Sequence, residues 1–294
     1  MKKKQLASKL HFKEGKGWRA YAATMRGKTH KINDDAFFIM PMEEGIVAAV
    51  CDGVSGARHG RKASHAVVHR IEEKEEWILK QARKGWRAGE NLLEDARSAI
   101  KKGETTIILA VIDLENGKHH VWNVGDGHGY LIRGKRERIL TEEHTPRLFY
   151  PDPYEGGYKR SKLKVKLWDV KKTAENCGEM QNIILSCLQP GNKKIGIISY
   201  NGRTDIHKNN KLLKPLTVRK NDIFLLTTDG LSDYIDYCLK NEERDISEGP
   251  NILQDIRRKI LIENNPEYML ELMEKANAFK GDDATFVAVV LDKI

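Results

Sequence analysis

The sequence predicts an α+β fold in which antiparallel β-sheets are covered by paired helices. Strand-like runs and helical stripes come in separate blocks along the 294 residues, whereas a parallel sheet would alternate each strand with a helix. An Asn116-Gly117 turn separates two apolar runs, which is typical of a two-residue β-hairpin. Only antiparallel strands can use such a short connection, so we expect the sheets to be antiparallel.

The chain begins with a sheet and continues with helices. Strand-like runs are predicted at 18–24, 36–40 and 46–51. Apolar residues at helical spacing follow at 63–82 and 92–100. Two consecutive helices of this kind favour a paired antiparallel helical layer.

A second group of strands is predicted after these helices, at 105–112, 121–124 and 130–133. The periodicity then degrades, because residues 149–214 contain several turn dipeptides and many lysines between short apolar runs. We interpret this stretch as an irregular insertion or flap.

The C-terminal part returns to regular patterns. A strand is predicted at 222–228, helical stripes at 252–260 and 269–276, and a last strand at 284–291. No internal repeat or low-complexity linker interrupts the chain. We therefore expect one enlarged domain over 18–294, preceded by a basic N-terminal segment over 1–17.

Composition and charge exclude several classes of protein. The chain is 40% apolar and 32% charged, and no uncharged apolar run approaches the roughly 20 residues that span a bilayer. We expect a cytoplasmic protein without a membrane partner. The net charge of +9 could attract nucleic acid, but the basic runs at 133–136 and 159–162 carry little aromatic interleaving. Binding to nucleic acid is therefore not expected.

The four cysteines show neither Cys-x-x-Cys pairing nor clustering with histidines. We expect reduced, mostly buried thiols. No Cys-x5-Arg phosphate loop is present, and Cys51 precedes Asp52-Gly53, which argues against a thiolate nucleophile.

Aspartates next to glycines or other acids stand near the ends of several predicted strands. They are Asn33-Asp34-Asp35, Asp52-Gly53, Gly125-Asp126-Gly127, Asp229-Gly230 and Gly281-Asp282-Asp283. Mg²⁺ and Mn²⁺ prefer carboxylate, carbonyl and water oxygens, and glycine lets a backbone carbonyl approach an ion. One such corner alone would indicate a β-turn. Five together predict a divalent metal site.

The order of these segments resembles the metal-dependent protein phosphatase family, also called protein phosphatase 2C-like, and in particular its bacterial members. The similar segments are Asn33–Ala36, Ala49–Gly56, Gly103–Thr106, Asn123–Gly127, Leu140–His144, Asp222–Asp233 and Gly281–Thr285. Each is short and permissive, but in this order they are specific, and they extend from about residue 19 to 291.

The resemblance implies a centre with two Mn²⁺ or Mg²⁺ ions. Asp52 would bridge the ions, and Gly53 would offer its carbonyl to one of them. Asp229 and Asp282 would complete the protein ligands. The ions would activate a shared water and orient it in line with the phosphoester, so the nucleophile would be hydroxide and not a side chain.

Further acids have roles implied by the same resemblance. Asp34 and Asp35 would hold metal-bound waters, and Asp35 would join Asp52, Asp229 and Asp282 as a catalytic residue. Asp126 and Asp233 match positions that help to bind a third, more weakly held ion in bacterial members.

The phosphate-binding edge departs from the family pattern. His30 stands where the family has its usual phosphate-binding arginine, within a Gly-x-x-His segment similar to that of a bacterial subgroup. His30 is therefore the candidate phosphate ligand, with help from Arg26, Lys28 or Lys31. Alternatively, His30 lies in a solvated loop. Val54 replaces a histidine that serves many eukaryotic members as leaving-group acid.

We therefore expect a four-layer αββα sandwich, two stacked antiparallel β-sheets flanked by antiparallel helices, with the metals at one end. The expected activity of the 18–294 catalytic domain is hydrolysis of phosphoserine and phosphothreonine in proteins. Its partners would be a phosphoprotein substrate and a cognate Ser/Thr kinase in signalling. The alternative is a catalytically weak or silent phosphatase-like module that binds phosphoproteins or acts as a scaffold. A third interpretation, a nucleic-acid-binding protein, is supported by the net charge alone.

Overall fold

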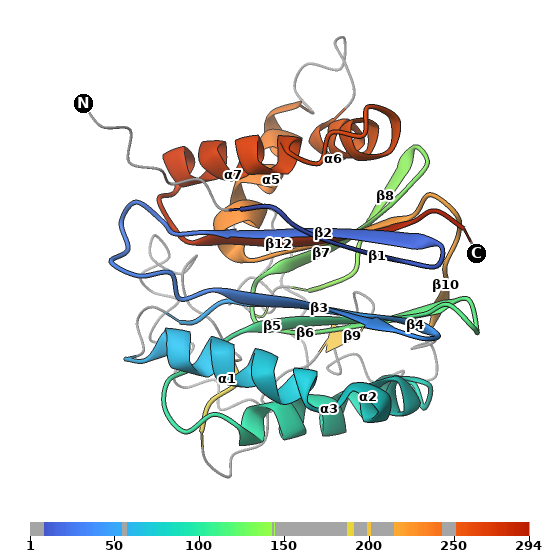
Figure 1. Ribbon diagram of the computed structural model, residues 1–294. Coiled ribbons are helices and arrows are strands. Elements are labelled where there is room, and N and C mark those ends of the chain that lie inside the picture. The colour runs from blue at the N-terminus through green and yellow to red at the C-terminus, as the bar shows by residue number, and fades with distance from the viewer. Residues whose placement is uncertain are drawn as a thin grey trace, which may run out of the picture.

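A computed structural model describes residues 9–54, 58–142, 144, 187–190, 199–200, 215–242 and 251–293 of the chain. Most of the insertion or flap predicted at 149–214 lies outside these residues, as does Cys177. The described elements form four layers, helices on sheet on sheet on helices (Figure 1). The predicted four-layer αββα fold is confirmed.

The first sheet has six antiparallel strands in the order β1-β2-β12-β11-β7-β8. They are β1 (His11–Gly15), β2 (Trp18–Met25), β7 (His128–Arg133), β8 (Arg136–Ile139), β11 (Ile223–Thr227) and β12 (Ala284–Leu291). β1 falls within the segment that was expected to precede the domain. Every residue of β1 is exposed, so it carries no apolar signal, and only its backbone pairing with β2 makes it a strand.

The second sheet is also antiparallel, in the order β10-β6-β5-β4-β3, with β9 paired to β6. Its strands are β3 (Ala36–Met42), β4 (Gly45–Cys51), β5 (Ile107–Asp113), β6 (Lys118–Val124), β9 (Ser199–Tyr200) and β10 (Leu216–Thr217). β4 and β5 are buried along their whole length because a helical layer covers one face and the first sheet covers the other.

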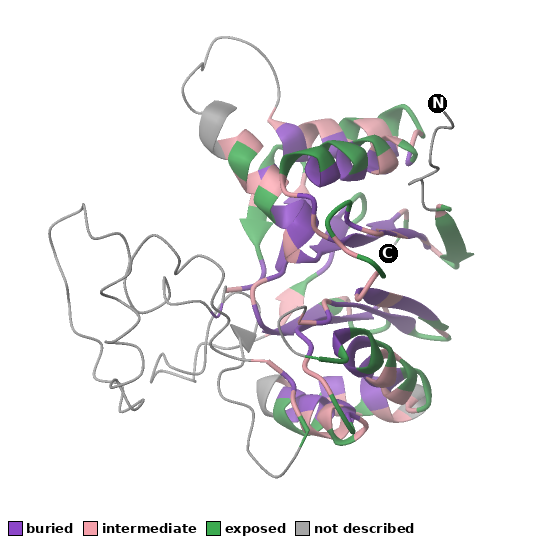
Figure 2. Ribbon diagram, turned by 90° about the vertical axis from the view of Figure 1, so that its left-hand side faces the viewer, coloured by how far each residue is buried: buried purple, intermediate pink, exposed green. Residues whose placement is uncertain are grey.

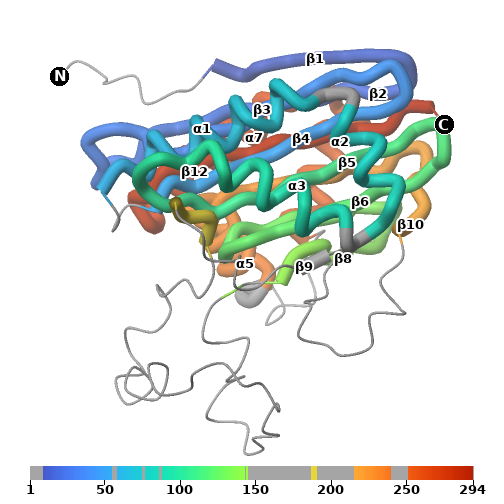
Figure 3. Tube along the Cα trace, turned by 90° about the horizontal axis from the view of Figure 1, so that it is seen from below, coloured from blue at the N-terminus to red at the C-terminus, as the bar shows by residue number. Residues whose placement is uncertain are grey.

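Helices α1 (Gly60–Glu72), α2 (Glu75–Ala82) and α3 (Trp86–Ser98) cover the second sheet, as the view from below shows (Figure 3). The sequence predicted one helical stripe over 63–82, but a turn at Glu73 and Lys74 divides it into α1 and α2. The run from Glu72 to Glu76 contains no apolar residue, so the apolar stripe of the sequence is interrupted there.

The first sheet is covered by α5 (Asp229–Glu242), α6 (Ile252–Arg257) with the following π-helix η4 (Arg258–Ile262), and α7 (Tyr268–Phe279). α5 was not predicted, because its opening Asp229-Gly230 indicated a metal-binding corner. Its buried residues Leu231 and Ile235 lie one turn apart, which is the helical signal.

The space between the sheets is filled by interdigitating apolar side chains, many of them alanines such as Ala20, Ala22, Ala48 and Ala110. Figure 2 shows the strands of both sheets largely buried and the exposed residues gathered on the outer helices. The described cysteines, Cys51, Cys187 and Cys238, are free thiols. Within the described ranges, no helix has both the length and the apolar character that crossing a membrane requires.

Candidate active site

Four of the five aspartate corners lie at one end of the first sheet, where its strands end or begin, because the strand register brings them there. We call this end the acid-bearing edge. β2 ends at Met25 opposite Ala284, where β12 begins, and β11 ends at Thr227 opposite His128, where β7 begins. The segments beyond these four strand ends are the ones that carry the predicted acids. They therefore meet at a single edge.

The fifth corner, which carries Asp52, comes from the second sheet. It follows Cys51, the last residue of β4, which pairs with Ala36 at the start of β3. Asp35, directly before Ala36, accepts a hydrogen bond of 2.8 Å from the Thr228 hydroxyl of the first sheet. This contact joins the acid-bearing ends of the two sheets.

The backbone at Asp52 is held firmly while its carboxylate is left free. The Asp52 carbonyl accepts hydrogen bonds from the Thr106 N–H at 2.8 Å and the Thr105 hydroxyl at 2.7 Å. A Cβ on Gly53 would lie 2.5 Å from the Gly60 carbonyl carbon, so only glycine lets α1 begin this close. Among the described residues, none donates a hydrogen bond to the Asp52 carboxylate.

The acids crowd one another electrostatically. Burial and the Asp229 charge raise the pKa of Asp52 well above its ordinary value, and they raise the pKa of Asp126 to about 8. Burial, followed by the charge of Asp229, also raises the pKa of Asp282. Asp35 and Asp126 each have a buried carboxylate oxygen without a hydrogen-bond partner in the described part of the chain. Buried, mutually repelling oxygen donors of this kind fit hard divalent cations.

The carboxylates are nevertheless not gathered around one point. Across the described ranges, no three His, Cys, Asp or Glu side chains stand close enough together to hold an ion. A lysine lies among them instead. The Lys280 ammonium donates to Asp229 Oδ2 and lies 2.9 Å from Asp233 Oδ2 and 3.3 Å from Asp282 Oδ2. Burial by itself lowers the pKa of Lys280, but the charges of Asp229 and Asp233 outweigh it and raise the pKa.

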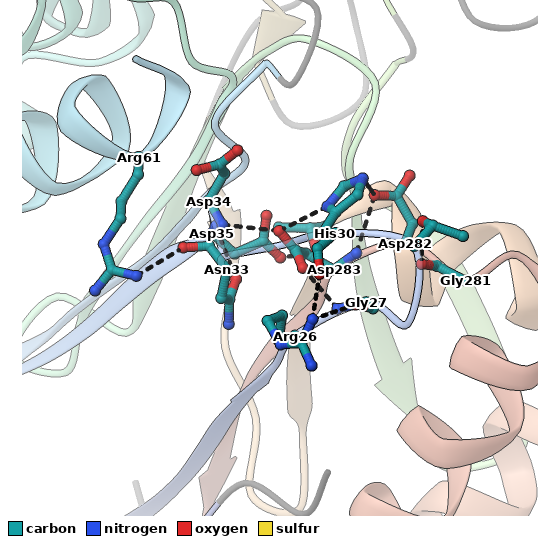
Figure 4. Close-up of polar contacts among 12 residues, drawn as sticks. Arg26, Gly27, His30, Asn33, Asp34, Asp35, Arg61, Gly281, Asp282 and Asp283 are labelled. Atoms are coloured by element: carbon teal, nitrogen blue, oxygen red, sulfur yellow. Dashed lines mark hydrogen bonds and ion pairs between the residues drawn. The ribbon is translucent and has the colours of Figure 1, made fainter. Parts of the chain in front are cut away.

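His30 lies inside the acid cluster and not in a solvated loop (Figure 4). Its Nδ1 is 3.0 Å from Asp283 Oδ2, and its Nε2 is 3.4 Å from Asp282 Oδ1. Asp283 also accepts hydrogen bonds from the N–H groups of Gly27 at 2.6 Å and Asp34 at 2.7 Å. Burial opposes a charged imidazole, but the two carboxylates raise the pKa of His30. His30 is therefore placed to orient Asp282.

The other predicted phosphate-binding cations point in different directions. The Arg26 guanidinium donates to two backbone carbonyls of its own loop, as Figure 4 shows. Lys28 donates to the Ala278 carbonyl at 2.9 Å, at the end of α7. Lys31 is exposed. Arg26 and Lys28 thus hold the backbone around the acids, and Lys31 faces solvent.

The sequence analysis gave no site role to two cations, Arg61 and Lys280. Arg61 is exposed at the start of α1 and donates to the Asn33 carbonyl at 3.2 Å. It lies just before the helical stripe predicted from residue 63, and α1 begins at Gly60. The available signal for Lys280 was its place directly before Gly281-Asp282, but spacing alone does not say where a lysine side chain points.

Comparisons with known proteins identify the family and the fold. Residues 24–259 match the model of a family described as protein phosphatase 2C. No curated protein matches the sequence. Among solved structures, the serine/threonine phosphatase PstP/Ppp of Mycobacterium tuberculosis is 18% identical with a TM-score of 0.59, and the alignment covers 94% of this chain and 99% of that one.

Two further structures are similar in fold. The serine/threonine phosphatase Stp1 of Staphylococcus aureus is 18% identical with a TM-score of 0.58, and 93% of this chain and 95% of that chain are covered. The catalytic domain of PstP in complex with two manganese ions is 18% identical with a TM-score of 0.53, and 94% and 99% are covered. At these identities the structures support the fold.

Proposed function

Because the chain belongs to the protein phosphatase 2C family, we propose that it hydrolyses phosphoserine and phosphothreonine in proteins, using a water activated between two Mn²⁺ or Mg²⁺ ions. The observation that carries this proposal is the meeting of five aspartate corners from two sheets at one edge. A relative of known structure binds two manganese ions, which supports the choice of metal.

The residues proposed to hold the ions are Asp52, the Gly53 carbonyl, Asp229 and Asp282. When bound, such ions lower the pKa of a water molecule and stabilise charge on phosphoryl oxygens. Asp52 is suited to bridging because its backbone is fixed by Thr105 and its carboxylate has no hydrogen-bond donor among the described residues.

Asp34 and Asp35 are proposed to orient water at the centre. Asp35 is buried, and its Oδ2 is fixed by the Thr228 hydroxyl while its Oδ1 has no partner in the described ranges. One oxygen therefore sets the orientation and the other is left for a water. The Asp34 backbone is fixed by Asp283 and by the Ser64 hydroxyl, which donates to its carbonyl at 2.6 Å.

The phosphate-binding group is proposed to comprise His30, Arg26 and Lys31. His30 lies next to Asp282, a proposed metal ligand. It can therefore contact a phosphate only beside Asp282. Lys31 is exposed at the mouth of the same loop, so it can reach an incoming phosphoprotein without breaking a structural contact. Val54 offers no proton, so the departing alkoxide would take its proton from water.

The proposal is tested by hydrolysis of phosphoserine, phosphothreonine and phosphotyrosine peptides with Mn²⁺, Mg²⁺ or a chelator. We expect metal-dependent turnover of the phosphoserine and phosphothreonine peptides, and its loss in Asp52→Asn and Asp229→Asn. Asp95→Asn is the control, because Asp95 pairs with Arg70 on the helical layer. Undiminished turnover in Asp52→Asn would contradict the proposed role of Asp52 in a metal-dependent phosphatase.

The alternative, a weak or silent phosphoprotein-binding module, draws support from Lys280, which engages three of the carboxylates. The two functions separate in a calorimetric titration with Mn²⁺, since a silent module of this kind would take up no metal. For the active enzyme we further propose a cognate Ser/Thr kinase that makes its substrate. Because such a kinase needs ATP, we propose that both proteins act in cytoplasmic signalling.

A further inference from the structure

A lysine side chain stands where acids from several elements approach one another. Asp229 and Asp233 lie one turn apart on α5, Asp282 precedes β12, and the Lys280 ammonium contacts all three. Asp126, from the loop before β7, feels the charges of both Asp229 and Lys280. An ammonium has three N–H donors, which matches the three carboxylates in contact with it.

The backbone on both sides of Lys280 is fixed, so the direction of its side chain is built into the fold. Its N–H donates to the Ala276 carbonyl at 2.9 Å and ends α7. Gly281 follows with φ of +81°, and its carbonyl accepts from the Thr29 N–H and hydroxyl at 3.1 and 2.6 Å. A left-handed residue that is clamped in this way turns the chain sharply from α7 into Asp282.

The lysine contacts one side of the acid cluster and leaves the other side open. It takes Oδ2 of Asp229 and Oδ2 of Asp282, while Asp282 Oδ1 faces His30. Asp229 Oδ1 and the Asp52 carboxylate have no partner within the described part of the chain. The open side is the one proposed for the two ions. Asp233 lies on the lysine side at 2.9 Å from the ammonium, whose charge also acts on Asp126.

We propose that Lys280 is a built-in cation that takes the place of a third divalent ion beside Asp126, Asp229 and Asp233, so that this centre binds two ions. The inference rests on the proposed function for the identity of the two-ion ligands. One buried carboxylate oxygen of Asp126 has no hydrogen-bond partner among the described residues, as expected at the border of a cation site. Like charges repel, so the ammonium and a divalent ion cannot share this position.

The test counts Mn²⁺ bound per full-length chain by equilibrium dialysis, up to millimolar free metal. We expect two ions in the wild type and three in Lys280→Met, because the carboxylates then lack their cation. Lys280→Arg keeps the charge and should bind two. Lys280→Met combined with Asp233→Asn should return to two, since the third site loses a ligand. Lys275→Met, at an exposed position on the same helix, is the matched control and should bind two.

A thermal unfolding measurement guards against misfolded variants. In chelator, Lys280→Met should unfold at a lower temperature than the wild type, and Mn²⁺ should raise its midpoint by more than it raises that of the wild type. Three ions in the wild type, or two in a folded Lys280→Met, would overturn the inference and leave the proposed function standing. No ion in the wild type and two in Lys280→Met would also overturn it, because the lysine would then block the main site. No ion in either protein would contradict the proposed function itself.

Discussion

His30 shows how a single residue can be correctly selected and yet have a different position from the one expected. Its two ring nitrogens face Asp283 and Asp282 at 3.0 and 3.4 Å, so the imidazole lies between acids. Groups that orient a metal ligand from behind affect metal affinity more than substrate affinity. Lys31 is exposed on the same loop and orients no proposed metal ligand.

Replacing His30 with alanine is therefore expected to weaken Mn²⁺ binding by about 10-fold or more, because Asp282 Oδ1 loses the imidazole that faces it and keeps only the Asp283 N–H at 2.9 Å. Lys31→Ala should leave Mn²⁺ affinity unchanged and raise KM for a phosphopeptide. Calorimetry with Mn²⁺ and steady-state kinetics separate the two effects. A His30→Ala protein that keeps its metal affinity and shows only a raised KM would mean that His30 binds phosphate without orienting Asp282.

His119 gives a prediction about pH. Its imidazole is buried with its ring centroid 4.8 Å from that of Phe224, and burial lowers the pKa of His119 to about 3. The unfolded chain takes up this proton near pH 6.5, so the stability that neutral His119 contributes is present above pH 6.5 and is lost as the pH falls. We expect His119 to cost about 2 kcal/mol of unfolding free energy between pH 7 and pH 5. Urea unfolding at both pH values checks this, and His119→Phe should show a smaller loss than the wild type.

At the scale of elements, Arg83 connects the α2–α3 layer to the second sheet. Its Nε and Nη2 contact both oxygens of Asp113 at 2.8 and 3.0 Å, and its Nη2 reaches Glu44 at 2.9 Å. Asp113 is only 1% exposed at the end of β5. Burial alone would raise the pKa of Asp113, but the Arg83 hydrogen bonds outweigh it and lower the pKa.

Arg83→Met is expected to destabilise the fold by about 3 kcal/mol, because it leaves a buried carboxylate without its cationic partner and with hydrogen bonds from Asn116 alone. The matched change Arg70→Met breaks a more exposed pair with Asp95 and should cost about 1 kcal/mol or less. Guanidinium unfolding curves measure both free energies. Equal costs for the two variants would mean that the hydrogen bonds from Asn116 are enough to hold the buried Asp113 carboxylate.

At the scale of the whole molecule, the proposed ion ligands come from both sheets. Asp52 follows β4 of the second sheet, whereas Asp229 and Asp282 stand at the ends of β11 and β12 in the first. Metal bound between them would link the two halves of the sandwich at one end. Metal binding should therefore be coupled to global stability.

Adding Mn²⁺ at about 100 times its Kd should stabilise the wild type by about 2.7 kcal/mol for each ion bound. Asp52→Asn should lose most of this gain, because the ligand from the second sheet is weakened. Calorimetric melting with Mn²⁺ and with chelator measures the difference, and Asp95→Asn serves as the control. A wild-type melting temperature that does not respond to Mn²⁺ would argue against ions at this edge.

Many of the strands and helices, and the acid corners, could be predicted from the sequence alone, because local residue patterns indicate them. The strand over 284–291 has the predicted bounds, because a long apolar run buried on both faces gives a strong signal. The acid corners were visible because aspartates beside glycines at strand ends are rare as a set. Elements without such patterns escaped: β1 is wholly exposed, and α5 opens with Asp229-Gly230. At that opening, the partial positive charge of a helix N-terminus stabilises an acid.

Only the tertiary structure decided how the charges are paired. The sequence placed Lys280 two residues before Asp282, but α5 and α7 had to pack together before its ammonium could reach Asp229 and Asp233. It likewise placed His30 in a loop, and β12 had to pair with β2 before Asp283 could hold that loop. Residue types and their order are local properties and can be read from the chain. The direction of a long side chain depends on contacts distant in sequence, and so it follows from the fold.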